Sequence, residues 1–116
     1  MRAIRGAITV QDNTPFAVAD ATCALLRELE RRNDLHPSEI ISVFFTLTPD
    51  INAMFPAQAA RQMGWDVPML DMQEVPVPGS LDRCLRVLVH VERDCDVRHV
   101  YLRGARCLRP DLEEES

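Results

Sequence analysis

The sequence predicts an α+β domain in which a mixed β-sheet has helices packed on one of its faces. Apolar segments of strand length recur along the chain, at 2–10, 40–48, 84–92 and 97–102. Two segments with helical character, 14–32 and 56–64, accompany them. Strands combined with two helices are typical of this fold class. A chain of 116 residues corresponds to a single domain, 1–116.

The first strand and helix have clear signals. Residues 2–10 alternate between two faces, as a strand does. Thr14 offers a capping hydroxyl and Pro15 suits the first helical position, so a helix is expected from there to about Arg32. Asn33-Asp34 ends it. The expected core stripe of this helix is Val18, Thr22, Leu25, Leu26 and Leu29.

The later elements follow from apolar runs and breakers. Residues 40–48 form a strongly apolar strand, and a shorter helix is expected from near Pro56 to Gly64, a natural C-terminal cap. A short strand at 67–70 and a proline-rich loop at 76–80 come next. The remaining predictions are strands at 84–92 and 97–102, a polar turn at 93–96, and an irregular tail at about 105–116.

Composition excludes several kinds of chemistry. All thirteen basic residues are arginine, so lysine-based Schiff-base chemistry and a phosphate-loop lysine are excluded. A net charge of −5 argues against nucleic-acid binding. The sequence has no apolar run long enough for a membrane span and no signal peptide at its start, so we expect a cytoplasmic protein without a membrane partner.

Cysteine and histidine do not form a metal-binding pattern. The four cysteines, Cys23, Cys84, Cys95 and Cys107, lack paired short spacing, and the three histidines do not complete a zinc set. We expect no metal, no cofactor and reduced thiols.

Arg86 stands out in an otherwise apolar strand. Strand alternation places Leu85 and Val87 on one face and Arg86 on the other. A guanidinium is always charged and costs several kcal/mol to desolvate without a partner. Arg86 therefore predicts an anion nearby. A structural ion pair, a solvent-exposed strand face and a bound ligand all remain open from this strand alone.

An ordered set of segments carries a resemblance to a known family. The segments are Ile4-Arg5-Gly6-Ala7, Thr48-Pro49-Asp50, Phe55-Pro56-Ala57, Gln73-Glu74, Arg86, Arg98-His99-Val100-Tyr101-Leu102 and Leu108-Arg109-Pro110-Asp111-Leu112. Over nearly its whole length the chain resembles the AroH class of monofunctional chorismate mutase. The resemblance implies a homotrimeric pseudo-α/β-barrel, with sheets facing the centre and active sites between subunits. It also implies conversion of chorismate to prephenate in aromatic amino acid biosynthesis, leading to phenylalanine and tyrosine.

That reaction, an intramolecular Claisen rearrangement, suits the composition. An ether C–O bond breaks while a C–C bond forms, so the reaction needs no nucleophile, metal or redox cofactor. The catalyst must hold a flexible dianion in a compact shape and stabilise the ether oxygen as it gains charge. Arginine fits this task because its fork can grip a carboxylate and an adjacent oxygen together.

The resemblance assigns catalytic roles by position. Arg86 is expected to contact the ether oxygen and the enolpyruvyl carboxylate. Arg5 and Tyr101 are expected to hold the same carboxylate. Glu74 should accept a hydrogen bond from the ring hydroxyl and face the partial positive charge that builds on the ring.

Further substrate-binding residues are implied in the same way. Phe55 and Ala57 should line the pocket wall, Arg61 should lie near its mouth, and Leu108 and Arg109 should close over the ligand. Met69 and Leu70 complete this implied set. Arg61 on a solvent-facing helix surface and Arg109 in a disordered tail are the alternatives. His99 is expected to be structural.

Two positions depart from the family pattern. Asp71 stands where the family often has a small polar residue, and Gln58 where a lysine can occur. Both changes remove positive potential, so they affect affinity more than reaction type. We expect Asp71 at the pocket edge, in contact with the ring hydroxyl or a water. Repulsion of the dianion, or pairing with Arg5 or Arg86, are the alternatives.

Two other functions compete with this assignment. One is a trimeric binding or sensor protein that has kept the pocket and lost catalysis; the complete set of Arg5, Glu74, Arg86 and Tyr101 argues against it. The other is an imine deaminase of the Rid type. Its pattern does not include the segments 98–101 and 108–111.

Overall fold

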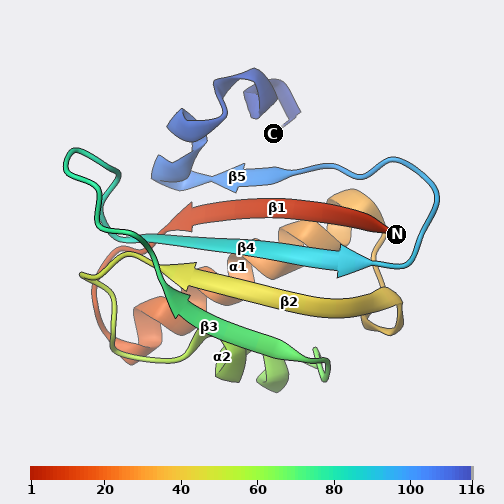
Figure 1. The fold of residues 1–116 in the computed structure, drawn as a ribbon, viewed down its shortest axis with the longest axis horizontal. Helices are drawn as coiled ribbons and strands as arrows, with labels where there is room; N and C mark the ends of the chain where they lie inside the picture. The colour runs from red at the N-terminus through yellow and green to blue at the C-terminus, as the bar shows by residue number, and fades with distance from the viewer. Residues whose placement is uncertain (116) are drawn as a thin grey trace.

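The protein is built around one five-stranded mixed sheet. A computed structural model describes residues 1–115. The strands are β1 (Arg2–Thr9), β2 (Ile40–Leu47), β3 (Met69–Gln73), β4 (Cys84–Val91) and β5 (Val100–Leu102). Their order across the sheet is β3-β2-β4-β1-β5, with β4 antiparallel to both neighbours and the two edge strands parallel to theirs (Figure 1). The predicted mixed sheet is confirmed.

Helix α1 (Pro15–Asn33) begins where the sequence predicts. The Thr14 hydroxyl accepts a hydrogen bond from the Ala17 amide at 3.1 Å, and Pro15 occupies the first turn. The helix ends at Asp34, which adopts a left-handed conformation with φ of 46°. The whole expected core stripe of α1 is buried. This helix covers one face of the sheet (Figure 1).

Gly6 allows α1 and β5 to approach β1 closely. A Cβ at this position would lie 3.1 Å from Val87 Cγ1, 3.2 Å from Leu25 Cδ1 and 3.2 Å from the Val100 carbonyl oxygen. Most real Cβ contacts are longer than this, so glycine is the residue that fits without displacing its neighbours.

Helix α2 (Pro56–Gln62) lies on the same side of the sheet as α1 and contacts both α1 and β3. Gly64, with φ of 106°, follows its end as predicted. Trp65 is fully buried just beyond, and its indole Nε1 donates to Glu30 Oε2 at 2.7 Å. The indole therefore ties the end of α2 to α1.

The two faces of the sheet differ. Side chains on the helix-covered face form the main core and include Ile4, Ile8, Val43, Phe45, Leu85, Val87 and Val89. The opposite face, which we call the open face, carries Arg5, Ala7, Phe44, Thr46, Arg86, Leu88 and Tyr101, because residues paired across neighbouring strands share a face. The open face carries Arg5 and Arg86, two of the charged residues that the sequence singles out.

Two strand boundaries differ from prediction. β3 runs over 69–73 rather than 67–70, because its ladder with β2 begins at Met69. β5 covers only 100–102 rather than 97–102. The Asn33 side chain accepts from the Arg98 amide at 2.7 Å and donates to the Arg98 carbonyl at 3.0 Å. The backbone of Arg98 therefore pairs with the end of α1 instead of with a strand.

The segment after β5 is helical rather than irregular. It forms two 3₁₀ helices, η2 (Arg103–Leu108) and η3 (Pro110–Glu115), and a third, η1 (Pro37–Glu39), precedes β2. Ala105 of η2 is buried with Ala7 and Cys84 in a second, smaller core. This packing places η2 over one end of the open face.

Within residues 1–115, no helix is long and apolar enough to cross a membrane. The same part of the chain holds no group of three or more histidine, cysteine or acidic side chains placed to bind a metal ion.

Candidate active site

Arg86 and Glu74 form an ion pair on the open face. Arg86 lies on β4, and Glu74 directly follows β3, where its amide donates to the Leu47 carbonyl at 2.8 Å. Between them runs β2, whose Thr46 is opposite Arg86 in register. The Thr46 hydroxyl donates to Glu74 Oε2 at 2.7 Å, and Arg86 Nε lies 3.0 Å from the same oxygen. Glu74 thus reaches across β2 and is held on both sides.

The ion pair leaves Arg86 only partly satisfied. Its Nε is buried and close to Glu74, yet the N–H makes no aligned hydrogen bond to any described residue. The Arg86 side chain is 41% exposed, whereas that of Glu74 is 15% exposed. A partly exposed pair of this kind adds little stability. Arg86 therefore keeps the capacity to bind an added anion.

Tyr101 shares the open face with this pair, and Arg109 lies against Tyr101. Ala7 is opposite both Arg86 and Tyr101, so these two side chains flank a residue with only a methyl group. The guanidinium carbon of Arg109 is 6.0 Å from the centre of the Tyr101 ring, and Arg109 pairs with Asp111 at 2.9 Å. Leu108 packs in the same small core as Tyr101. The tail residues thus border the open-face group of charges.

Arg5 is exposed on the same face, two residues before Ala7. Its backbone amide donates to His99 Nδ1 at 3.0 Å. Burial, and secondarily the charges of Arg109 and Arg5, lower the pKa of His99. A neutral His99 can accept this hydrogen bond. The contact is with the backbone of β1, which is consistent with a structural role for His99.

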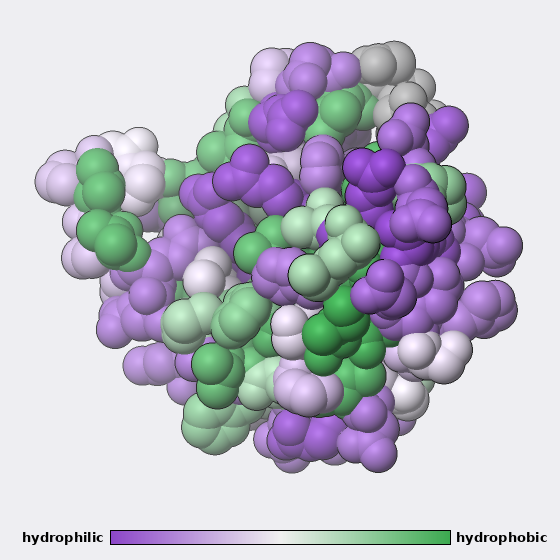
Figure 2. All heavy atoms as spheres, turned by 45° about the vertical axis from the view of Figure 1, so that its right-hand side comes forward, coloured by the Kyte–Doolittle hydropathy of each residue, from purple (hydrophilic) through white to green (hydrophobic). Residues whose placement is uncertain are grey.

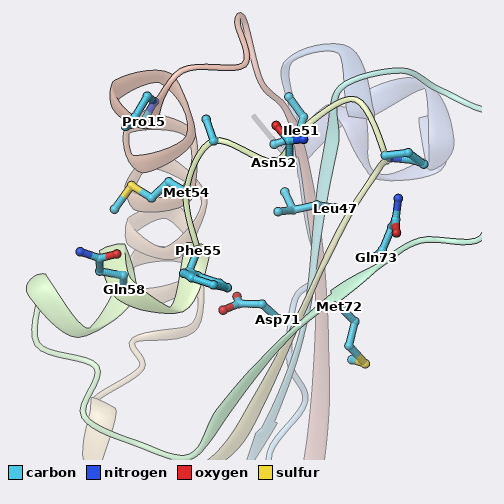
Figure 3. A pocket seen from close by; sticks show the side chains of 12 residues that line it. Pro15, Leu47, Ile51, Asn52, Met54, Phe55, Gln58, Asp71, Met72 and Gln73 are labelled. Carbon is cyan, nitrogen blue, oxygen red and sulfur yellow. The ribbon is translucent and has the colours of Figure 1, made fainter.

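A cavity of about 750 Å³ lies at the β3 edge, between the sheet and the segment that leads into α2. It is lined by Pro15, Leu47, Pro49, Ile51, Asn52, Ala53, Met54, Phe55, Gln58, Asp71, Met72 and Gln73 (Figure 3). Three of the predicted binding residues, Phe55, Gln58 and Asp71, are among them. Asp71 Oδ1 accepts a hydrogen bond from the amide of Ala57 at 3.0 Å.

The predicted residues fall into two groups within one chain. Side chains alternate along β3, so Asp71 faces α2 while Leu70 and Glu74 face the other way. The open-face group contains Arg5, Glu74, Arg86, Tyr101, Leu108 and Arg109. The cavity group contains Phe55, Ala57, Gln58 and Asp71. One chain does not bring the two groups together.

The other predicted residues lie nearby. Leu70 is 58% exposed at the sheet edge, and Met69 is half-buried against the main core. Arg61 is exposed on α2. Asp71 contacts the α2 backbone, and neither Arg5 nor Arg86 is its partner in this hydrogen bond. Burial raises the pKa of Asp71, with the Ala57 amide and Arg61 acting against it.

Sequence reasoning missed two residues that support these groups. Thr46 positions Glu74; a threonine within an apolar strand, on the face that Arg86 shares, was the available signal. Asn13 holds the loop that lines the cavity, because its Oδ1 accepts from the amides of Asn52 and Ala53 at 2.9 and 3.0 Å. Its place next to the cap of α1 gave no indication of that long-range contact.

Cys84 does not act as a nucleophile in this setting. It is fully buried next to the Arg86 strand position, and burial raises the pKa of its thiol to about 11. The thiol is therefore protonated near neutral pH. What the fold and site define is a small α+β protein with arginine side chains held on one open face of its sheet.

Comparison with known proteins identifies the family to which this chain is similar. Residues 1–112 match the family described as chorismate mutase type I. The chain is 51% identical to chorismate mutase AroH of Thermus thermophilus, over 97% of each chain. It is 40% identical to chorismate mutase AroH of Bacillus subtilis (strain 168), over 97% of this chain and 92% of the relative.

A solved structure agrees with these matches. A chorismate mutase from Clostridium thermocellum superposes with a TM-score of 0.89 at 48% identity, covering 92% of this chain and 99% of that one. This chain belongs to the chorismate mutase type I family.

Proposed function

We propose that this chorismate mutase converts chorismate to prephenate at sites that are shared between neighbouring subunits of a homotrimer. Family membership supplies the activity. The observation that supports a shared site is the separation of the open-face group from the cavity group within one chain. A neighbouring copy that brings its cavity group to the open face would complete the constellation.

Arg86 is the residue proposed to act on the reacting bond. The ether oxygen gains negative charge as the C–O bond breaks, and a fixed guanidinium beside it lowers the energy of that state. One well-placed group of this kind is worth about 3–4 kcal/mol in a site that excludes water. Arg86 is already oriented by Glu74, so little reorganisation is needed when substrate binds.

The remaining open-face residues hold the rest of the substrate. Arg5 and Tyr101 share the open face with Ala7, and Arg109 lies against the Tyr101 ring, so these three side chains are proposed to grip the enolpyruvyl carboxylate. Glu74, fixed by Thr46, accepts from the ring hydroxyl. Holding both ends of the molecule favours the compact shape from which the rearrangement proceeds.

Apolar side chains on the open face support the trimer. Leu70 is 58% and Met72 is 42% exposed, and Phe44 and Leu88 beside them are only half-buried. Apolar residues gather between polar surroundings on this side of the molecule (Figure 2). Exposed apolar patches mark interaction surfaces, and here a second copy of the chain would cover them.

We place the enzyme in the cytoplasm. All four cysteines are unpaired, as is usual in a reducing compartment.

Two measurements test the proposal. Purified protein should deplete the diene absorbance of chorismate and form prephenate. If chorismate is not converted, the proposed activity is refuted. Co-purified mixtures of Arg86→Ala and Phe55→Asp subunits should then be more active than either variant alone. A mixed trimer can contain one intact site only if the two groups come from different subunits. Equal inactivity of the mixture and of each variant alone would refute a shared site.

A further inference from the structure

The carboxylate of Asp71 is the least expected group at the cavity. It lies in the middle of β3, and the substrate is a dianion, which a second free carboxylate would repel. The structure gives this carboxylate a partner on another element. Its Oδ1 accepts a hydrogen bond at 3.0 Å from the backbone amide of Ala57, fourteen residues earlier in the chain.

The Ala57 amide needs this partner. Pro56 at the first helical position has no N–H, and the amide of Gln58 is already bonded to the Phe55 carbonyl at 3.0 Å. The residue at the N-cap, Phe55, has no side-chain group that can accept a hydrogen bond, and none is made. Ala57 is 4% exposed, and a buried amide left unpaired is costly. Asp71 thus supplies from β3 the cap that the local sequence of α2 lacks.

The cap decides where the cavity wall lies. Phe55 immediately precedes α2 and is 67% exposed, and Gln58 lies in the first turn of the helix. Both line the cavity together with Asp71 (Figure 3). Because the hydrogen bond joins β3 to the start of α2, it fixes the distance between the sheet edge and these two side chains.

We propose that Asp71 is a positioning residue, whose carboxylate caps α2 from β3 and thereby holds Phe55 and Gln58 in the shape that binds substrate. Its effect on catalysis rests on the proposed function, whereas the cap itself does not. This role differs from a direct contact with the ring hydroxyl. It also explains how a carboxylate is tolerated here, because one of its oxygens accepts a hydrogen bond from a backbone amide.

The first test uses the unmodified protein. The amide proton of Ala57 should shift with pH with the same midpoint as the Asp71 carboxyl, both followed by NMR. An Ala57 amide that does not respond while Asp71 titrates would overturn the cap.

The second test uses three variants. Asp71→Asn keeps an oxygen acceptor without the charge, Asp71→Ala removes the acceptor, and Asp66→Ala removes the same charge from an exposed loop position between α2 and β3. Hydrogen exchange of the Ala57 amide should accelerate by about tenfold or more in Asp71→Ala, as expected for the loss of one hydrogen bond. It should remain slow in Asp71→Asn and Asp66→Ala.

Kinetics then separates positioning from contact or repulsion. In Asp71→Ala we expect KM for chorismate to rise by about tenfold while kcat changes less than about threefold, because the wall binds ground and transition states alike. Asp71→Asn should stay within about threefold of wild type in both.

A lower KM in Asp71→Ala would indicate repulsion and overturn the proposal. An Asp71→Asn variant as impaired as Asp71→Ala would show that the charge matters, which also overturns it. If the exchange results hold and no protein, wild type included, converts chorismate, the cap stands and the proposed function fails.

Discussion

At the scale of single residues, the proposed site depends on where a few charged side chains are held. Arg86 is anchored by one carboxylate, and that carboxylate is anchored by Thr46 from the strand between them. The arrangement keeps a cation in place without consuming its binding capacity. The predictions at this scale therefore concern the charge and geometry of single side chains and the protonation of His99.

Charge and fork geometry at position 86 are both expected to matter. Arg86→Ala should lose at least about 10³-fold in kcat, more than a single neutral oxyanion donor usually costs. Arg86→Lys retains the charge but not the fork, so it should recover only part of the loss. Stopped assays for prephenate, with circular dichroism to confirm folding, provide the measurement. A folded Arg86→Ala protein within tenfold of wild type would exclude Arg86 from the reaction.

Gln58→Lys should tighten substrate binding. Gln58 is exposed and lines the cavity, where an added ammonium attracts the dianion equally in its ground and transition states. KM should fall with little change in kcat, and the gain should shrink as salt rises, because an exposed charge is screened. Gln62→Lys at the end of the same helix is a matched control. Identical KM values for Gln58→Lys and wild type at low ionic strength would contradict the prediction.

His99 is expected to make stability depend on pH. Its pKa is lowered in the folded protein, so below the ordinary value of 6.5 the unfolded chain binds the proton first. The contribution of His99 is therefore fully present above about pH 6.5 and is lost as the pH falls through the lower, folded-state pKa. The groups facing it are cationic, Arg5 and Arg109, and protonation also removes the Nδ1 acceptor from the Arg5 amide.

Urea unfolding at a series of pH values measures this dependence. His99→Asn offers an oxygen acceptor that does not titrate, so its stability should fall less between pH 7.5 and 5.5 than that of wild type. Equal pH dependence in the two proteins would show that another group is responsible.

At the scale of elements, short segments are ordered by contacts with distant ones. β5 and η2 are held against β1, and α2 is tied to α1 by Trp65 and to β3 by Asp71. None of these segments is long enough to be stable alone.

The contact between η2 and β1 gives a prediction at this scale. The amide of Gly104 donates to the Thr9 hydroxyl at 3.0 Å, and a Cβ at Gly104 would lie 2.9 Å from Thr9 Cγ2. Gly104→Ala should therefore lower the free energy of unfolding by about 1–3 kcal/mol, the usual cost of overpacking. Displacement of η2 also moves Leu108 and Arg109, so KM for chorismate should rise.

Two variants serve as controls for this substitution. Thr9→Ser removes the methyl group that clashes, so the Gly104→Ala/Thr9→Ser double variant should recover part of the stability and of the KM. Cys107→Ser is an exposed change in the same helix and should lie within about 0.5 kcal/mol of wild type. An unaltered unfolding midpoint in Gly104→Ala would mean that η2 is not held closely against β1.

At the scale of the whole molecule, the chain has one covered face and one open face. The helices bury the first, and η2 covers only one end of the second. The open face holds both the charged group and exposed apolar side chains. Assembly and activity should therefore depend on the same surface.

Met72→Asp tests this dependence. Placing a carboxylate on the apolar part of the open face should dissociate the proposed trimer into monomers and abolish turnover, because burying an unpaired charge is costly. Sedimentation velocity and the chorismate assay together measure it. Phe16→Asp, an equally polar change at an exposed residue of α1, should leave both unchanged. A trimeric Met72→Asp protein, or a dissociated Phe16→Asp protein, would place the interface elsewhere.

The sequence by itself determined the elements whose signals are local. The Thr14-Pro15 start of α1, its buried stripe, the strand around Arg86 and the glycine after α2 are present in the structure as predicted, because caps, periodicity and alternation act within a few residues. The mixed sheet and the chorismate mutase family could also be predicted from the sequence. The order of the elements indicated the sheet, and the resemblance of several segments indicated the family.

Tertiary structure decided the features that depend on distant partners. β5 is short because Asn33 takes up the backbone of Arg98, and the tail after Gly104 is helical because Ala105 is buried on the open face. Asp71 turns to the α2 backbone because that helix has no cap of its own. Each outcome rests on a hydrogen bond or contact between residues far apart in the chain, where local pattern carries no information and only packing selects the partner.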